Sequence, residues 1–348
     1  MTPLAQSLAL SPEVYPHTLD AVNDAVLFVR LTETDYARAS FLDQRALAPG
    51  TKGDWVHWTA VQAAVEEAGL EEDLGFVFHI GHVGSTLLSR LIGGHPSVLS
   101  LREPLPLRTL AQLQLEIETP ESIWSPEDLD ARVGVLLGLW SRRFRDGQLA
   151  VVKATSFCSE LAAPIVARNS RPRAVLMAVR PEPYLATIFA GQNNHLDIRG
   201  MATNRLRRLH ARIGGPAWRL HELSYGEQVA MTWAAETTSL AEAQASGGER
   251  AMWLDFERLL AEPEPTLAEV FAHFGRVVSE VEVAAIAAGP EMRRYAKAPE
   301  HGYDAKLRRT VLDQARREHA GEMRKGLAWL ERAAGVYPLI ARALETRV

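Results

Sequence analysis

The stretch Gly75-Phe-Val-Phe-His-Ile-Gly-His-Val-Gly-Ser-Thr86 decides the fold that we predict for this chain. Its first half, Gly75–Ile80, is short, apolar and rich in aromatic and β-branched residues, which predicts a buried strand. Its second half, Gly81–Thr86, holds two glycines and two hydroxyl residues, and a helical apolar pattern follows from Leu87. A buried strand that enters a helix through such a turn is typical of parallel α/β sheets.

The same alternation continues along the chain. Apolar segments that helical patterns separate predict four further strands, at Val98–Leu101, Leu149–Lys153, Ala174–Val179 and Ala251–Asp255. Since each segment is apolar throughout, we expect a parallel sheet with helices on both faces, followed by a mostly helical C-terminal part. Ligands of such sheets bind at the carboxyl ends of the strands. The residues directly after the strands are therefore the first candidates for a site.

Residues 75–348 show no shift of composition, and we expect them to form one α/β domain. Residues 1–74 are interpreted as an N-terminal extension with a helix near residues 57–70. We expect residues 1–50 to be irregular, because prolines interrupt every pattern there. The interruptions are Pro3, Pro12, Pro16 and Pro49-Gly50.

The composition excludes several classes of protein. A net charge of −5 argues against a general nucleic-acid binder, and no uncharged apolar run approaches the length of a membrane span. The single cysteine, Cys158, cannot form an internal disulfide or a cysteine-based zinc site, and we find no other metal cluster. The first 25 residues contain no Lys or Arg, so no secretory signal is expected. We expect a cytoplasmic protein, either monomer or homodimer.

The turn after the first strand predicts an anion site. A helix N-terminus presents unpaired N–H groups and the positive end of the helix dipole, and Gly81 and Gly84 permit positive φ and close approach. Ser85 and Thr86 add hydroxyl donors. A Walker A loop is excluded, since its spacing and its lysine are absent. The alternative is a tight turn capped by Ser85.

Phe76–Arg90, followed by His95-Pro96 and Arg102-Glu103-Pro104, resembles the phosphosulfate-binding segment of PAPS-dependent sulfotransferases. PAPS is 3′-phosphoadenosine 5′-phosphosulfate. The run Gly84-Ser-Thr-Leu-Leu88 is similar to that of bacterial members. Val151–Thr155, Arg180–Pro183 and Asp255–Pro263 resemble later family segments in the same order. The resemblance covers about residues 75–275. It implies a P-loop NTPase-like sulfotransferase fold and sulfuryl transfer from PAPS to a hydroxyl or amine acceptor, without a metal.

The resemblance also implies which residues bind PAPS. By this resemblance the turn binds the 5′-phosphosulfate and Arg180 binds the 3′-phosphate. Thr187 lies near the position of a family serine. The segment Arg324-Lys325-Gly326 resembles a further 3′-phosphate element of the family. The alternatives are a surface salt bridge between Arg180 and Glu182 and an exposed helix at residues 324–326. The residues expected at the 5′-phosphosulfate are Gly81, Gly84, Ser85, Thr86 and Leu87.

Three residues are candidates for catalysis. Glu103 is the expected base, and its alternative is a cap or ion pair at the helix that begins near Pro104. Lys153 ends an apolar strand in a chain with only five lysines, and its alternative is an extended stem with a solvated ammonium. His82 stands where the family has a Lys or Arg. Thr155 stands where cytosolic members have their base histidine, and Ile188 stands where the family has a serine, so this chain departs from the family at three points.

The sequence does not identify the acceptor. The segment from Arg199 to Arg219 contains six arginines, which favours an anionic acceptor, and the alternative is a solvated helix face. Two other functions stay open. An ATP-using phosphotransferase would need Asp255 or Glu257 for Mg²⁺. A non-catalytic nucleotide- or anion-binding protein would have kept the fold and lost the chemistry.

Overall fold

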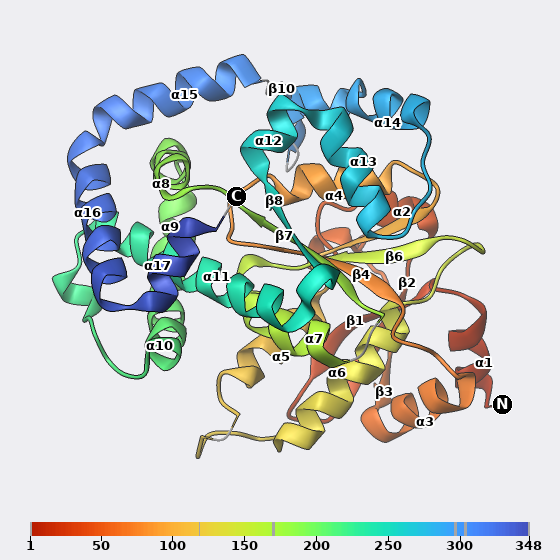
Figure 1. Ribbon diagram of the computed structural model, residues 1–348. Coiled ribbons are helices and arrows are strands. Elements are labelled where there is room, and N and C mark those ends of the chain that lie inside the picture. The colour runs from red at the N-terminus through yellow and green to blue at the C-terminus, as the bar shows by residue number, and fades with distance from the viewer. Residues whose placement is uncertain (1, 118, 169–170, 296–297, 303–304, 347–348) are drawn as a thin grey trace.

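A five-stranded sheet lies at the centre of the computed structural model, which describes residues 2–117, 119–168, 171–295, 298–302 and 305–346 (Figure 1). The strand order is β5-β6-β4-β7-β8, and every neighbouring pair is parallel. All five strands therefore end at the same edge of the sheet. The strands are β4 (Leu74–His79), β5 (Val98–Arg102), β6 (Leu149–Lys153), β7 (Arg173–Ala178) and β8 (Ala251–Asp255).

Helices cover both faces of this sheet. The helix α4 (Ser85–Gly93) packs on one face, and α7 (Ala162–Arg168) and α11 (Tyr225–Gly247) pack on the other (Figure 1). The helices α5 (Leu105–Gln114), α6 (Pro126–Trp140) and α8 (Pro181–Ala190) connect strands. The predicted α/β class is confirmed, and each predicted strand lies within one residue of its observed bounds.

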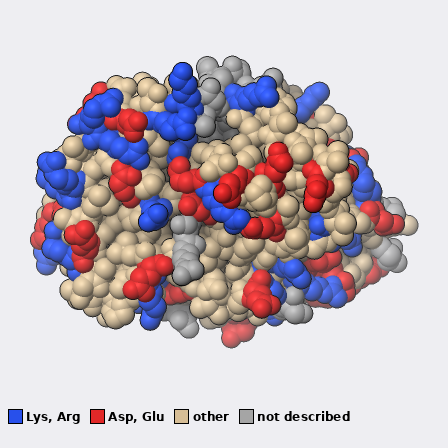
Figure 2. Space-filling view, turned by 45° about the horizontal axis from the view of Figure 1, so that its top comes forward, with Lys and Arg blue, Asp and Glu red and all other residues tan. Residues whose placement is uncertain are grey.

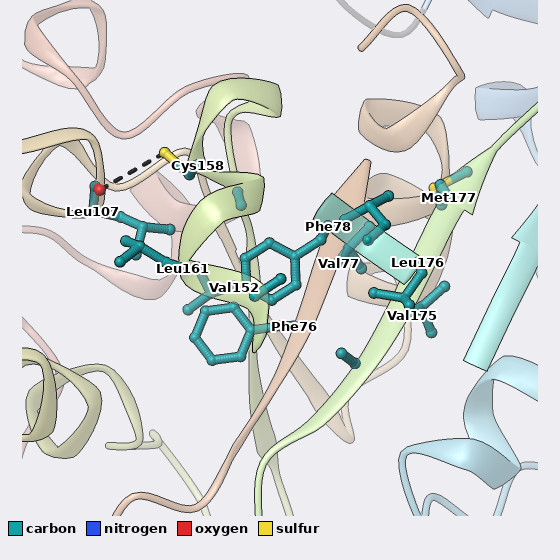
Figure 3. Packing of buried hydrophobic residues seen from close by; sticks show 14 of the residues in the cluster. Phe76, Val77, Phe78, Leu107, Val152, Cys158, Leu161, Val175, Leu176 and Met177 are labelled. Carbon is teal, nitrogen blue, oxygen red and sulfur yellow. Dashed lines mark hydrogen bonds between the residues drawn. The ribbon is translucent and has the colours of Figure 1, made fainter. Parts of the chain in front are cut away.

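The strands are buried because their side chains are apolar on both faces. β4 and β6 are buried at every position, and the rings of Phe76 and Phe78 stack with centroids 5.0 Å apart (Figure 3). Cys158 lies in the same core, where its thiol donates to the carbonyl of Leu107 over 3.7 Å. Burial raises the pKa of this thiol to about 12, so Cys158 is a core residue without nucleophilic character.

The expectation of an irregular segment at residues 1–50 is wrong. This segment contributes α1 (Pro3–Leu10), β1 (Val14–Asp20), β2 (Ala25–Arg30) and α2 (Glu33–Arg38), and β3 (Gly53–His57) completes an antiparallel sheet in the order β1-β2-β3. Pro16 interrupts no pairing, because β1 is an edge strand and its register shifts between Pro16 and Thr18. Edge strands and bulges are the positions where a sheet tolerates proline. The predicted helix near residues 57–70 is α3 (Trp58–Ala68).

Buried arginines connect this N-terminal sheet to the central one. Arg142 donates to the carbonyls of Ser11 and Val14 over 2.9 and 2.7 Å. Arg102, at the end of β5, donates to the carbonyl of Ala39 over 2.7 Å. The backbone N–H of Leu42 in turn donates to the carbonyl of Arg102 over 2.7 Å. These bonds bring the residues that follow α2 to the carboxyl end of β5.

The part after β8 is mostly helical, as predicted. The helix α16 (Ala320–Val336) crosses α11 where two glycines meet: a Cβ at Gly326 would lie 2.5 Å from the carbonyl oxygen of Gly226. Two short strands, β9 (Arg294–Tyr295) and β10 (Ala298–Gly302), form a separate pair. The remaining helices are α9 (Asn194–Gly200), α10 (Ala202–Ile213), α12 (Phe256–Ala261), α13 (Pro263–His273), α14 (Glu280–Ala287), α15 (Ala305–Glu318) and α17 (Pro338–Glu345).

The surface carries charges of both signs. Figure 2 shows acidic and basic side chains interspersed over the face that it presents. In the described part of the chain, no helix combines the length and the apolarity that crossing a membrane requires.

The glycine crossing gives a direct test of the packing of α16 on α11. Gly326→Ala should lower the free energy of unfolding by about 1–3 kcal/mol, because the new methyl group overlaps the backbone of α11. Gly335→Ala on the same helix is the matched control, since a Cβ there meets no atom within 4 Å. The control should gain up to about 1 kcal/mol from helix propensity. Urea denaturation measures both variants, and equal stabilities would contradict the observed crossing.

Candidate active site

The candidate residues gather because their strands are neighbours in the sheet. Glu103 follows β5, Lys153 ends β6, the turn of residues 80–84 follows β4, and Arg180 follows β7. The order β5-β6-β4-β7-β8 puts these positions side by side along the carboxyl edge. This is the edge where the sequence predicts a ligand.

The turn between β4 and α4 has an unusual backbone. Gly81, His82 and Gly84 have φ values of 85°, 56° and 68°, in the left-handed region. A Cβ at position 84 would also lie 1.9 Å from the ring of Phe256, which begins α12 after β8. Position 84 therefore needs glycine for its conformation and for its packing. His82 has a side chain in a conformation that few non-glycine residues adopt, and such outliers gather at functional sites.

Beyond Gly81, the backbone N–H groups of this turn and of the start of α4 are unbonded within the part of the chain that the structure describes. Among the described residues, none accepts a hydrogen bond from the N–H groups of residues 82–87, whereas Ile80 and Gly81 donate to Met177 and His79. No side chain caps α4, so the alternative of a Ser85 cap is not what the structure shows. The hydroxyl of Thr86 is buried and also has no hydrogen-bond partner among the described residues. These donors, at a helix N-terminus, suit a phosphate- or sulfate-sized anion.

Glu103 and Lys153 form an ion pair at the ends of the adjacent strands β5 and β6. Thr155 donates to the second carboxylate oxygen of Glu103 over 3.2 Å. Lys153 is buried, with 1% of its side chain exposed, so its ammonium is not solvated. Glu103 does not cap α5, whose N-cap is Pro104. Each carboxylate oxygen keeps a further lone pair, so Glu103 can accept a proton from a ligand.

Residues 41–45 border this ion pair, and the sequence analysis missed them. The ammonium of Lys153 lies 6.0 Å from the centroid of the Phe41 ring, and the guanidinium of Arg45 lies 3.8 Å from the same centroid. Arg45 also bonds both oxygens of Asp43, over 2.9 and 2.6 Å. No local motif signals this arrangement, because it depends on the bonds that tie the N-terminal part to β5.

The arginine-rich segment is divided: Arg199, Arg207 and Arg219 are exposed, whereas the other three arginines are engaged inside the molecule. Arg205 and Arg208, both fully buried, donate to the same oxygen of buried Glu236 over 2.8 and 2.7 Å. Arg208 and Arg212 also pair with Glu160 over 2.9 and 2.5 Å. The expectation that these three arginines bind an acceptor, and its alternative of a solvated face, are therefore both wrong. Buried guanidinium groups need carboxylate partners, and here η2 (Ser156–Leu161) and α11 supply them.

The buried network reaches the turn through Asp197. The Nε2 atom of His82 lies 3.2 Å from one carboxylate oxygen of Asp197, and Arg205 bonds the same carboxylate over 3.2 Å. Burial alone would raise the pKa of Asp197, but the bond from His82 and the charge of Arg205 hold it well below its usual range. His82 is thus the end of a chain of ion pairs that begins inside the protein.

The other predicted phosphate-binding residues differ in their contacts. Arg180 is exposed and forms no ion pair with any described residue, and Glu182 bonds Arg316 over 2.8 Å instead. Thr187 donates to the carbonyl of Pro183 within α8. Lys325 pairs with Glu322 over 2.6 Å on the exposed side of α16. Arg324 is likewise exposed and without an ion pair among the described residues, so the guanidinium groups of both Arg180 and Arg324 can hold a phosphate.

The carboxylates that a Mg²⁺-dependent phosphotransferase would use are engaged. Asp255 accepts a bond from the backbone N–H of Glu257 over 2.9 Å and caps α12. Both oxygens of Glu257 bond Arg308. This arrangement gives the ATP-using alternative no support.

No family model matches the chain, and no curated protein matches it in sequence. Solved structures with a partial likeness include the sulfotransferase domain from the curacin biosynthetic pathway, at 13% identity and a TM-score of 0.41 over 71% of this chain and 97% of that one. A sulfotransferase from Alicyclobacillus acidocaldarius has 14% identity and a TM-score of 0.38 over 75% and 95% of the two chains. A mouse sulfotransferase complexed with PAP has 10% identity and a TM-score of 0.39 over 82% and 93%. Such low values leave the function to be argued from this chain's own residues.

The free N–H groups of the turn predict that sulfate binds there without a nucleotide. In a ¹H–¹⁵N spectrum, titration with sulfate should shift the amide signals of residues 82–87. The N-terminus of α6 is the internal control, because Ser125 and Asp128 already cap its N–H groups. Equal shifts at both helices, or none at the turn, would exclude an anion site at α4.

The chain of ion pairs predicts a pH-dependent effect of Asp197→Asn. The lowered pKa of Asp197 stabilises the fold above the unfolded-state pKa near 4, and this contribution is lost as pH falls toward the folded-state value. The variant should be less stable than the wild type by about 2 kcal/mol at pH 7, the usual range for a bond to a charged group. The difference should shrink below pH 4.

Denaturation at several pH values measures this difference, and Asp54→Asn at an exposed position is the control. That control should stay within about 0.5 kcal/mol of the wild type. A constant difference between pH 7 and pH 3 would show that Asp197 does not act through its charge.

Proposed function

We propose that this chain transfers a sulfuryl group from PAPS to a hydroxyl or amine acceptor without a metal ion. The observation that carries the proposal is the row of N–H groups at residues 82–87 that no described residue accepts from. This row follows β4, whose neighbour β6 ends with Lys153, and Glu103 follows β5, the strand beyond β6. An anion held by the turn therefore has a candidate base and a buried cation on the neighbouring strands. The motif resemblance supports the same assignment.

The residues take the following roles in this proposal. The backbone of Gly84, Ser85 and Thr86 holds the 5′-phosphosulfate. Gly81 lets the anion approach the backbone closely, and Leu87 lies in the first turn of α4. Arg180 holds the 3′-phosphate, aided by Thr187. Arg324 and Lys325 stay predicted contacts, while Gly326 has a packing role. His82, beside Asp197, replaces the loop cation of the family.

PAPS would supply a sulfuryl group on a good leaving group. The acceptor hydroxyl loses its proton to the carboxylate of Glu103, and its oxygen bonds to sulfur while the bond from sulfur to the 5′-phosphate oxygen breaks. The products are a sulfate ester and PAP. Lys153 and the turn N–H groups stabilise negative charge in a fixed geometry, which is the main source of catalysis for transfers of this kind.

Substitutions of Arg180 and of Glu103 should affect different quantities, PAP binding for Arg180 and turnover for Glu103. Arg180→Ala should weaken PAP binding by about 2 kcal/mol or more, because a charge-assisted bond is lost. Glu103→Gln should leave PAP binding nearly unchanged and lower transfer from labelled PAPS by roughly 10²–10⁴-fold, the range for a general base. Calorimetry measures the first effect, and an acceptor panel in the presence of EDTA measures the second.

The control for Arg180→Ala is Arg219→Ala, which removes an exposed guanidinium from another part of the surface. Unchanged PAP affinity in Arg180→Ala, or a requirement for Mg²⁺, would contradict the proposal. Tight PAP binding without turnover on any acceptor would favour the non-catalytic alternative.

A further inference from the structure

The charges around Glu103 are not balanced. Glu103 and the neighbouring carboxylate of Asp43 are accompanied by three cations among the described side chains. Lys153 pairs with Glu103, and Arg45 pairs with Asp43. The remaining cation is Arg108, for which no hydrogen bond or ion pair exists within the described residues. The surplus positive charge of the cluster therefore lies on Arg108.

Arg108 lies close to the candidate base. It belongs to the first turn of α5, which begins two residues after Glu103. Its guanidinium lies 5.5 Å from the centroid of the Phe157 ring, and Phe157 follows Thr155, the donor to Glu103, by two residues. Arg108 is half-buried, so its charge is only partly screened by water.

Electrostatic effects on two neighbours agree with this placement. Burial opposes the charge of Asp43, yet bonds from Arg45 and the nearby charge of Arg108 hold its pKa below the usual value. The raised pKa of Cys158 is caused first by burial and is increased by the charge of Glu103, whereas Arg108 opposes the rise. The charge of Arg108 thus acts on Asp43, and together with that of Glu103 it acts on Cys158.

Two aromatic rings complete the arrangement. Phe41 and Phe157 are both half-buried, and each has a guanidinium above its ring, Arg45 on Phe41 and Arg108 on Phe157. A guanidinium stacked on a ring keeps its in-plane N–H donors available, and a carboxylate matches two of them. The rings offer apolar surface to the rest of a ligand.

We propose that the acceptor carries a carboxylate that pairs with Arg108 while its hydroxyl faces Glu103. This inference rests on the proposed function for the role of Glu103. The inference locates anion recognition at the start of α5. It does not use the arginine-rich segment, whose Arg205 and Arg208 are internal. An acceptor with this charge neutralises the surplus cation of the cluster, and a neutral acceptor leaves it unpaired.

A matched pair of probes tests the inference without turnover. 4-Hydroxyphenylacetate and 4-hydroxyphenethyl alcohol share a phenol and a two-carbon arm, and only the first carries a carboxylate. Calorimetry on the full chain should show at least tenfold tighter binding of 4-hydroxyphenylacetate. Arg108→Gln should abolish this preference, and Arg219→Gln, an exposed arginine of the arginine-rich segment, should keep it. Added salt should weaken the preference in the wild type.

Equal affinities of the two probes in the wild type, binding of neither probe, or a preference that survives Arg108→Gln would overturn the inference. Loss of the preference in Arg219→Gln would place the anion site in the arginine-rich segment instead. The melting temperature of each variant checks that it folds. A preference that depends on Arg108, together with no transfer from PAPS, would refute the proposed function and keep the binding site. Sulfuryl transfer to both probes, with equal affinities for the two, would refute only the inference that the acceptor carries a carboxylate that pairs with Arg108.

Discussion

The contact between Gly84 and Phe256 is the constraint on which the candidate site depends. The ring occupies the space of a Cβ, and the left-handed backbone at Gly84 starts α4 without a side-chain cap. As a result, no described residue accepts a hydrogen bond from the first N–H groups of α4. Phe256 follows β8, which pairs with β7 and not with β4, so this turn closes only when the sheet has assembled. The anion site is therefore a product of the tertiary fold.

Two groups of charges flank this turn, and they differ in balance. On the side of α9–α11, arginines and carboxylates bond one another inside the protein, and His82 meets the last carboxylate of the series, Asp197. On the side of β5 and β6, the pair of Glu103 and Lys153 is accompanied by Arg108, which has no carboxylate partner among the described residues. A buried network with matched charges holds a backbone in place, whereas an unpaired cation can bind an anionic ligand.

The sheet and the edge of the site could be predicted from the sequence because both depend on local patterns. Five apolar segments predicted the strands, and the residues after them predicted the positions of Glu103, Lys153 and the turn. The N-terminal sheet was missed because Pro16 breaks a pattern locally, while an edge strand tolerates it. The burial of Arg205 and Arg208 was missed because their partner, Glu236, lies about 30 residues away along the chain. The contribution of Phe41 and Arg45 depends on long-range backbone bonds that no pattern reveals.

A crystal structure of the chain with bound PAP tests the central claim most directly. The account predicts the 5′-phosphate against the N–H groups of Gly84, Ser85 and Thr86, the 3′-phosphate on Arg180, and Glu103 facing the 5′-phosphate from the side of β5. Binding of PAP elsewhere on the surface, or protein acceptors on those N–H groups in the complex, would contradict it.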